Sequence, residues 1–257
     1  MPRPFVVAHI SDLHCGSPYF VASLMERTII EINDLRPDVI VVSGDLTTFG
    51  FRQEYMQARA YLDRFDCPEM IVIPGNHDSR NVGYVHFEEL FGDRQGVLRK
   101  EGICFVAVDS SEPDLDHGTV GRGRYTWIRA QFAEPARLKV FVLHHHLLPI
   151  PGTGRERNVV YDAGDTLEAL MDSGCRLVLS GHKHVPYAWR LEDLFLVNAG
   201  TVSTLRLRGK GRPCYNIVEI DDERVRVVRK YPFHEREPII EFSTRTLEHE
   251  RWPGSSR

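Results

Sequence analysis

The sequence predicts an α/β protein, and three observations support this class. Short runs rich in β-branched and aromatic residues alternate with longer stretches of helical period, as they do when helices connect strands. Most of these runs are continuously apolar, which is typical of strands buried on both faces. The chain has 257 residues, of which 42% are hydrophobic and 26% are charged, values that suit one large globular domain.

Six apolar runs predict the strands of the buried sheet. In order, they are Phe5–Ile10, Asp38–Val42, Met70–Ile73, Ile103–Val108, Leu138–Leu143 and Arg176–Leu179. Between the first two runs, apolar residues recur at helical spacing from Val21 to Leu35, and Pro37 ends the pattern. The span from Tyr55 to Phe65 predicts a second helix with one apolar face. A third helix is expected around Leu167–Met171, with Asp165 as its N-cap and Gly174 after its end.

The character of the chain changes after about Phe195. Three strand-like pieces follow, at Phe195–Val197, Tyr215–Ile220 and Val225–Tyr231, and Asp221-Asp222 predicts a turn between the last two. We interpret these pieces as a hairpin that completes a second sheet. This places one domain at residues 1–231 and a partly disordered or subunit-contacting tail at residues 232–257. The apolar residues of the tail, Ile239, Ile240 and Phe242, could pack against the domain or contact a second copy, and a homodimer is the form expected in the second case.

Composition excludes several classes of protein. The net charge of −4 lacks the basic excess of a general nucleic-acid binder, so nucleic acid is not an expected partner. The five cysteines are odd in number, widely spread and without a CxxC pair, which argues against a disulfide framework and a thiolate zinc site. The amino terminus lacks the apolar core of a signal peptide, and no apolar run approaches the roughly 18 residues of a membrane span. We therefore expect a cytoplasmic protein without membrane attachment.

Potential metal ligands follow five of the six predicted strands directly. The segments are Asp12-Leu13-His14, Gly44-Asp45, Gly75-Asn76-His77-Asp78, His144-His145-His146 and Gly181-His182-Lys183-His184. Because functional sites in α/β sheets assemble at the carboxyl ends of strands, these five distant segments are expected to meet in one crevice. Each motif alone is compatible with ordinary turn chemistry, whereas the ordered set predicts a metal site.

This ordered set resembles the motif series of the calcineurin-like metallophosphoesterase superfamily, DxH, GD, GNHD/E, H and GHxH. The resemblance covers roughly Phe5 to Ile220. Three phrases are most similar to the branch that contains the class III cyclic nucleotide phosphodiesterases: His9-Ile-Ser-Asp-Leu-His14, Ser43-Gly-Asp-Leu-Thr47 and Pro74-Gly-Asn-His-Asp78. The resemblance implies a four-layer α/β/β/α sandwich of two mixed β-sheets flanked by helices.

Carried over position by position, the resemblance implies two metal sites. Asp12, His14 and His184 would hold one ion, Asn76, His144 and His182 the other, and Asp45 would bridge the two. Oxygen and imidazole ligands without thiolate suit Mn, Fe, Zn or Co, as divalent or mixed-valence ions, and the ligand types do not choose among these metals. In such a pair the ions activate a shared hydroxide for in-line attack on phosphorus.

The remaining motif residues are assigned to catalysis or to substrate. In the family, the histidine of GNHD, here His77, reaches the substrate phosphate, where it stabilises charge or protonates the departing oxygen. Asp78 would orient His77 or cap the following turn. The fourth motif departs from the usual His-His-Pro, and we align His144 as the ligand because it directly follows an apolar strand; His145 is the alternative ligand. Otherwise His145 would contact substrate, and His146 would be a loop residue.

For several other polar residues, a structural role is as plausible as a functional one or more so. His9 is expected to be a hydrogen-bonded histidine of the core or behind the ligands, and Cys15 a packed thiol. Two loops, residues 111–124 and 151–162, leave the same sheet edge and carry arginines that could grip a phosphate, although a solvated loop face is the commoner role. These arginines are Arg122, Arg124, Arg155 and Arg157.

The expected activity is hydrolysis of a small phosphodiester, with 3′,5′-cyclic nucleotides among the candidate substrates. The ligand motifs add only Lys183 as a cation, whereas a phosphomonoesterase usually adds cationic groups to bind a dianion. Three alternatives stay open: a phosphomonoesterase acting on a small metabolite, a nuclease, and a non-catalytic metal-binding scaffold. The acidic balance argues against the nuclease, and the complete ligand set argues against the scaffold.

Overall fold

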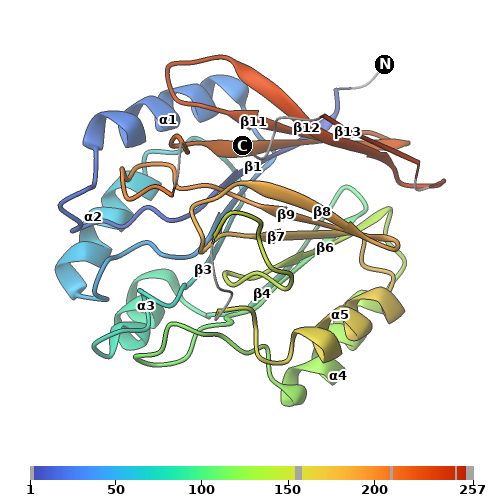
Figure 1. Cartoon of the computed structure of the whole chain (residues 1–257), viewed down its shortest axis with the longest axis horizontal. Coiled ribbons are helices and arrows are strands. Elements are labelled where there is room, and N and C mark those ends of the chain that lie inside the picture. Colours follow the sequence, from blue (N-terminus) through green and yellow to red (C-terminus); the bar gives the residue numbers. More distant parts are fainter. Residues whose placement is uncertain (1–2, 154–157, 209–210, 247, 253–257) are drawn as a thin grey trace.

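The computed structural model describes residues 3–153, 158–208, 211–246 and 248–252, and it consists of two β-sheets packed face to face (Figure 1). The first sheet has the strand order β13-β12-β11-β10-β1-β2-β3 and the second has the order β4-β5-β6-β7-β9-β8. The first sheet contains β1 (Phe5–Ile10), β2 (Val39–Ser43), β3 (Met70–Ile73), β10 (Tyr215–Ile220), β11 (Arg224–Lys230), β12 (Arg236–Ser243) and β13 (His249–Arg251). The second contains β4 (Gly96–Lys100), β5 (Ile103–Ala107), β6 (Leu138–Val142), β7 (Leu177–Ser180), β8 (Tyr187–Leu191) and β9 (Leu194–Asn198).

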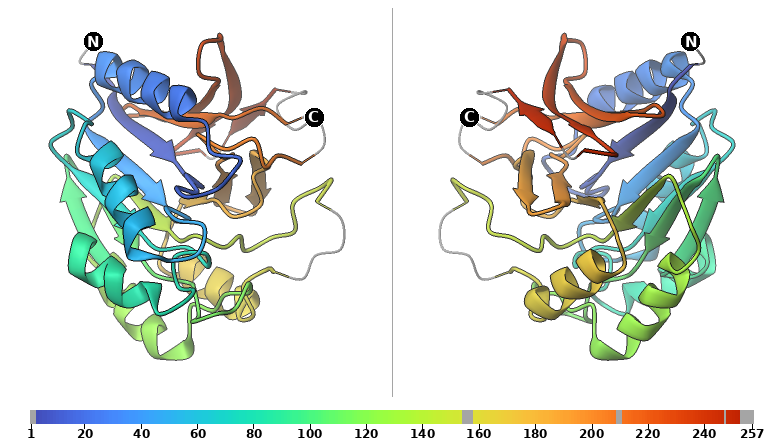
Figure 2. Two further views of the ribbon diagram at one scale, coloured as in Figure 1. Left: turned by 90° about the vertical axis from the view of Figure 1, so that its left-hand side faces the viewer. Right: turned by 90° about the vertical axis from the view of Figure 1, so that its right-hand side faces the viewer.

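Helices cover the outer face of each sheet, which confirms the predicted four-layer α/β/β/α sandwich (Figure 2). Over the first sheet lie α1 (Ala22–Leu35), α2 (Arg52–Leu62) and α3 (Gly83–Phe91). Over the second lie α4 (Arg122–Phe132) and α5 (Ala163–Asp172). Within the described ranges, no helix is both long enough and apolar enough to cross a membrane.

The continuous apolar runs arise because each central strand is buried on both faces. On β2, Val39 and Val41 belong to the core between the two sheets, while Ile40 and Val42 pack beneath α1 and α2. Successive side chains of a strand point to opposite faces, so both sets must be apolar. The predicted strands therefore match the observed ones to within a residue at most ends.

The carboxyl-terminal half of the chain differs from the prediction in two ways. The predicted hairpin exists, with its turn at Asp221, whose carboxylate accepts hydrogen bonds from the backbone N–H groups of Glu223 and Arg224. It extends the first sheet through antiparallel pairing of β10 with β1, while the second sheet takes in β5, β6 and β7, which the sequence placed in one series with β1. The apolar side-chain pattern of a strand does not determine which of the two sheets it joins.

Part of the segment predicted as a tail, residues 232–257, is folded against the rest of the chain. Residues 236–243 form β12, which pairs with β11, and Ile239, Ile240 and Phe242 lie in the core between the sheets. These side chains are therefore covered by the chain itself and supply no apolar surface for a second subunit. Residues 247 and 253–257 lie outside the described residues.

Several elements went unpredicted because their local patterns are weak. The helices α3 and α4 and the strands β4, β8, β12 and β13 were missed. Helix α4 begins at Arg122, inside the segment expected to be a loop. Helix α5 begins earlier than expected, with Asp162 at its N-cap position and Asp165 in its first turn. Asp162 instead accepts hydrogen bonds from the backbone N–H groups of Val120 and Gly121, so it ties α4 to α5.

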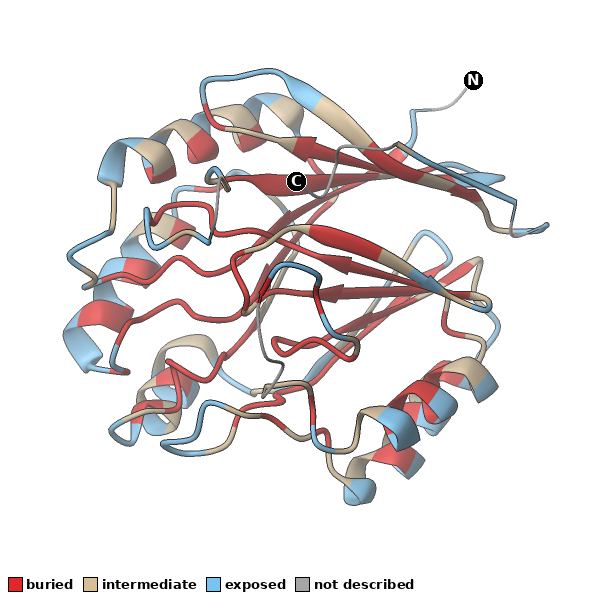
Figure 3. Ribbon diagram, viewed as in Figure 1, coloured by how far each residue is buried: buried red, intermediate tan, exposed pale blue. Residues whose placement is uncertain are grey.

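The parallel strands of the two sheets bring the five motif segments to one edge of the molecule. In the first sheet β1, β2 and β3 are parallel, and in the second β6 and β7 are parallel. The loops that leave their carboxyl ends are buried, unlike ordinary surface loops (Figure 3). Buried loops rich in histidine and aspartate need partners for their polar groups inside the protein. The candidate site is therefore expected where these loops meet.

Candidate metal centre

The backbone of the five motif loops is strained at the side chains that converge. Of the twelve non-glycine residues with positive φ in the described part of the chain, five are Asp12, His14, Asp45, His182 and His184. This conformation is unfavourable for residues with a Cβ and persists only where surrounding structure imposes it. Two flanking glycines are needed for close approach: a Cβ on Gly75 would lie 2.2 Å from Asp45 Oδ1, and one on Gly181 1.9 Å from Ser11 Oγ.

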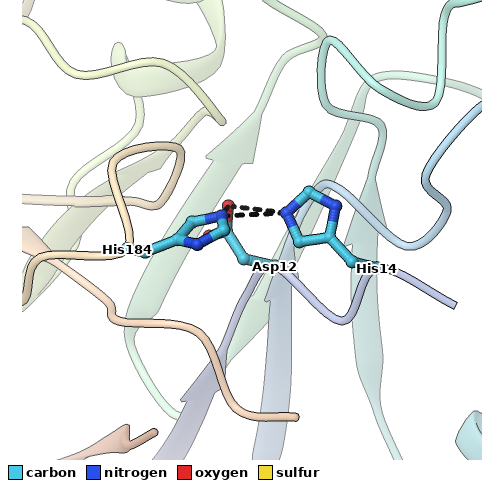
Figure 4. A group of neighbouring side chains, drawn as sticks. All are labelled: Asp12, His14 and His184. Atoms are coloured by element: carbon cyan, nitrogen blue, oxygen red, sulfur yellow. Dashed lines mark hydrogen bonds and ion pairs between the residues drawn. The ribbon is translucent and has the colours of Figure 1, made fainter. Parts of the chain in front are cut away.

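The first cluster of ligand-type side chains comprises Asp12 and His14 after β1 and His184 after β7 (Figure 4). His184 Nε2 lies 3.1 Å from Asp12 Oδ1, and His14 Nε2 lies 3.8 Å from the same oxygen. The two Nε2 atoms are 2.8 Å apart. All three side chains are buried, so one oxygen and two imidazole nitrogens share a small volume away from water.

The second cluster comprises Asp45 after β2, His144 after β6 and His182 after β7. Asn76 completes it, since its Oδ1 lies 3.2 Å from His144 Nε2 and 3.0 Å from His182 Nδ1. Asp45 Oδ2 lies 3.4 Å from His144 Nε2 and 3.6 Å from His14 Nε2. Asp45 therefore stands between the two clusters, as expected of the bridging residue.

Backbone carbonyls fix which ring nitrogen of the key histidines faces the cluster. His144 Nδ1 donates to the carbonyl of Ser43 at 2.7 Å, and His184 Nδ1 donates to that of Arg206 at 2.5 Å. A carbonyl can only accept, so Nδ1 carries the proton and Nε2 is the atom turned toward the carboxylates. This is the arrangement that metal-ligating histidines usually show.

The clusters pair acids with histidines electrostatically. Burial opposes ionisation of Asp45, but the charges of His144 and His77 outweigh it and hold its pKa well below the usual range. Burial likewise disfavours the charged form of His144, yet the Asp45 carboxylate raises its pKa to about 9. His14 lacks such compensation, and burial lowers its pKa to about 3. The group thus combines carboxylates with imidazoles of mixed protonation.

The donor set fits metal ions. Asp12 Oδ1, His14 Nδ1 and His182 Nε2 are buried and have no hydrogen-bond partner among the described residues. Unsatisfied buried polar atoms are costly, and a cation is one partner that would satisfy the oxygen and the His182 nitrogen. Carboxylate, amide and imidazole donors without thiolate suit first-row divalent metals.

His77 and Asp78 have different surroundings. His77 Nδ1 donates to the carbonyl of Thr48 at 2.7 Å, and the residue lines a cavity next to the clusters. One ring nitrogen of His77 also lies within 4.8 Å of ligand atoms of His14 and Asp45, so a ligand role is geometrically open to it. Asp78 is buried and is not among the residues that line the cavity.

Asp78 holds the Asp45 loop in place. Its carboxylate accepts hydrogen bonds from the backbone N–H groups of Leu46, Thr47 and Gly75. Burial and the neighbouring Asp45 carboxylate raise its pKa to about 7. Asp78 therefore positions two motif loops against each other and does not contact His77 through its side chain in any described hydrogen bond.

The three consecutive histidines have separate environments. His144 lies in the second cluster, as the favoured alignment expected, whereas His145 belongs to neither cluster although its ring lies beside that of His182. His145 Nδ1 lies 2.9 Å from Ser110 Oγ and its Nε2 lies 3.3 Å from the carbonyl of Asp116. Both ring nitrogens of His145 therefore have partners within the protein, and His145 is not among the residues that line the cavity. His146 lies in the loop, buried, with its ring stacked on that of His182.

The other polar residues singled out from the sequence make structural contacts where they are described. His9 Nε2 lies 2.9 Å from Ser43 Oγ in the core, and Cys15 is a buried thiol. Arg122 lies 3.5 Å from Asp165, and Arg124 donates to the carbonyls of Asp109 and Val120. Neither arginine lines the cavity. Arg155 and Arg157 lie outside the described residues.

A cavity of about 300 Å³ opens beside the clusters and includes residues that the sequence did not single out. Asp116 accepts hydrogen bonds from Asn76 Nδ2 at 3.4 Å and from Arg80 Nη2 at 2.5 Å, so it orients the Asn76 amide. Arg206 and Arg208 also line the cavity. Asp116 follows β5, the one predicted strand without a ligand motif; no local signal marked the two arginines.

The sandwich fold and this cluster at its strand ends together define a protein of the metallophosphoesterase class. The chain belongs to the calcineurin-like phosphoesterase family, whose family model matches residues 5–186.

Curated relatives support the same class. The chain is 27% identical over 210 residues to a cAMP/cGMP dual specificity phosphodiesterase of Mycobacterium tuberculosis, a match covering 71% of this chain and 63% of that protein. It is 28% identical over 198 residues to a glycerophosphodiester phosphodiesterase of Enterobacter lignolyticus, covering 70% of each. The chain thus spans a little under two thirds of the mycobacterial relative's length.

Solved structures share the fold. A purple acid phosphatase from yellow lupin superposes with a TM-score of 0.72 at 13% identity, over 95% of this chain and 54% of that one. A zinc complex of Vps29 from Entamoeba histolytica gives a TM-score of 0.53 at 12% identity, over 93% of this chain and 99% of that one. At such identities these likenesses show the fold alone.

Proposed function

We propose that this protein is a metal-dependent phosphodiesterase that hydrolyses a small phosphodiester. The observation that carries the proposal is the position of Asp45 between two clusters of ligand-type side chains at the floor of a cavity. Two ions joined by a shared carboxylate are suited to phosphoester hydrolysis, because they neutralise the phosphate and activate water.

The proposed ligand partition follows the two clusters. Asp12, His14 and His184 would hold one ion, Asn76, His144 and His182 would hold the other, and Asp45 would be shared between them. The candidate metals are Mn, Fe, Zn and Co, since the donors are nitrogen and oxygen. His77 acts on the substrate phosphate, with its Nδ1 proton engaged by Thr48 and its other nitrogen available to the cavity.

Three considerations favour a small phosphoester, and the first of them favours a diester. The mycobacterial and Enterobacter relatives are named as phosphodiesterases of cyclic nucleotides and of glycerophosphodiesters. Two divalent ions with Asp12 and Asp45 leave a local charge of about +2, which attracts a phosphate to a chain whose net charge is −4. The cavity of about 300 Å³ is at the small end of the range for ligand pockets, in keeping with a cyclic nucleotide or another small ester.

We place the protein in the cytoplasm. Its five cysteines are all free thiols, four of them buried, as suits a reducing compartment.

The test is a comparison of esters on manganese-loaded protein near neutral pH. With the leaving group held constant, kcat/KM for bis(4-nitrophenyl) phosphate should exceed that for 4-nitrophenyl phosphate, and 3′,5′-cyclic AMP should be hydrolysed. A monoester preference of about tenfold, roughly 1.4 kcal/mol in transition-state binding, would replace the diesterase with a monoesterase.

Two controls separate the remaining alternatives. The Asp45→Asn variant keeps the shape of the side chain and should lose the activity, which excludes a contaminating phosphatase. Metal content measured on the same sample identifies a scaffold: bound metal without turnover of any ester would support the non-catalytic alternative.

A further inference from the structure

The mouth of the cavity differs in charge from its floor. The floor consists of buried residues, with Asp45 1% and His184 8% exposed. The mouth carries Arg206 and Arg208, whose side chains are exposed. The third arginine of the lining, Arg80, is ion-paired with Asp116 at 2.5 Å and so contributes little net charge.

Arg206 and Arg208 are not neutralised in this way. Within residues 3–153, 158–208, 211–246 and 248–252, no carboxylate pairs with either guanidinium. Arg208 Nη1 donates to the carbonyl of Thr153 at 3.4 Å, which brings no negative charge. Two positive charges are therefore directed at one cavity without a described counter-ion.

The backbone that carries Arg206 is fixed relative to the metal clusters. Its N–H donates to Thr204 Oγ1 at 3.1 Å, and its carbonyl accepts the Nδ1 proton of His184 at 2.5 Å. Because His184 turns Nε2 toward Asp12, Arg206 is attached on the opposite side of the imidazole ring from the cluster. The guanidinium is thus part of the outer wall, beyond the ligands.

We propose that Arg206 and Arg208 form a subsite for a second phosphate group of the substrate, distinct from the phosphate that is cleaved. The proposal rests on the proposed function, since it assigns the scissile phosphodiester to the floor. A diester monoanion there is already attracted by the local charge of about +2 at the ions and does not need the outer arginines for its single charge. The two outer charges therefore call for another anion, and a phosphate dianion matches them better than a carboxylate does.

A matched pair of substrates tests the subsite. Thymidine 5′-(4-nitrophenyl phosphate) and its 3′-phosphorylated counterpart release the same leaving group from the same diester. On manganese-loaded protein, the 3′-phosphate should raise kcat/KM by about tenfold or more, the scale of one charge-assisted hydrogen bond. Arg206→Gln and Arg208→Gln should each reduce that ratio. Arg226→Gln, an exposed arginine on β11, is the control that leaves the ratio intact.

A binding measurement completes the test without turnover. Calorimetry on metal-free protein should show that Arg206→Gln lowers affinity for inorganic pyrophosphate more than for inorganic phosphate. The subsite would be overturned if kcat/KM were equal for the two thymidine substrates and Arg206→Gln lost the same factor in affinity for pyrophosphate and for phosphate. An equal loss of kcat/KM on both thymidine substrates in Arg206→Gln would also overturn it, because the arginine would then act on the scissile phosphate. Absence of hydrolysis of either substrate would instead defeat the proposed function, while the calorimetry would still decide on the arginines.

Discussion

At the scale of single residues, the metal cluster is built from side chains on strained backbone. Asp12, His14, Asp45, His182 and His184 all have positive φ, a conformation that costs of order 1–3 kcal/mol at a non-glycine residue. Strain of this size persists only if the surrounding structure imposes it, here through the hydrogen bonds of Asp78 and Thr201 to the motif loops. Bound cations would offset part of this cost, so metal loading is expected to raise thermal stability.

The shared position of Asp45 gives a prediction about stoichiometry. Asp45→Ala should lower the content of both ions and the rate of hydrolysis together, since the carboxylate faces both clusters. Metal analysis and turnover on the same preparation measure this, with Asp63→Ala, an exposed aspartate on the far end of α2, as the control. Two ions and full activity in Asp45→Ala would remove the bridging role.

His77 gives a prediction that separates catalysis from metal binding. His77→Ala should retain metal but lose roughly 10²- to 10⁴-fold in kcat, the usual scale for a general acid or a charge-stabilising donor. The structure also leaves His77 close enough to His14 and Asp45 to be a ligand. Loss of metal from His77→Ala would therefore show that His77 is a metal ligand and not a substrate contact.

At the scale of elements, Glu31 connects α1 to the carboxyl-terminal strands. Its Oε1 accepts hydrogen bonds from Arg27 at 2.7 Å and Lys230 at 3.0 Å, and its Oε2 accepts one from Tyr215 at 3.1 Å. Burial opposes the charged form of Glu31, but the hydrogen bonds from Arg27 and Lys230 outweigh it and lower its pKa. One carboxylate thus links a helix near the start of the chain to β10 and β11.

The lowered pKa of Glu31 sets the sign of a pH effect. The stabilisation is fully present above the ordinary pKa of 4.5 and is lost as pH falls through the lower folded-state pKa. Glu31→Gln should therefore destabilise the fold by about 1–2 kcal/mol at pH 7, and the difference from wild type should shrink below about pH 4.5. Thermal unfolding across pH measures this, and Glu26→Gln, in an exposed pair with Arg64, should show little effect. A pH-independent difference would contradict the assignment.

At the scale of the whole molecule, the last described strands complete the core between the sheets. The rings of Phe242 on β12 and Phe195 on β9 are stacked with centroids 3.8 Å apart at 7°, and both residues are buried. This contact joins the two sheets across the sandwich. Residues 236–243 are thus part of the domain and not an appendage.

Removal of this contact should be costly. Phe242→Ala should destabilise the protein by about 3–5 kcal/mol, because a large aromatic side chain leaves a cavity in a packed core. The comparison is Phe233→Ala, which truncates an aromatic side chain that is 58% exposed and should cost under about 1 kcal/mol. If a chain ending at residue 231 unfolded at the same temperature as the full chain, residues 232–257 would be a dispensable tail after all.

The sequence by itself determined the strands, the fold class and the convergence of the motif segments. Continuous apolar runs such as residues 39–42 mark central strands because both faces are buried, and motifs that follow neighbouring parallel strands must lie at one sheet edge. Ordered motifs tied to periodic elements are local signals, so they can be interpreted without coordinates. The helix α4 gave no such signal, since its stripe of Tyr125, Ile128 and Phe132 is short and surrounded by charge.

Only the tertiary structure decided which residues surround the two clusters. The sheet that β10 joins, the contact of His145 with Ser110, and the hydrogen bonds of Asp78 to the Asp45 loop all depend on contacts between distant segments. Arg206 lies behind His184 although 22 residues separate them in the sequence. Such contacts are set by how two sheets pack and not by the pattern within either segment. This is why the converging motif residues could be predicted from sequence and their surroundings could not.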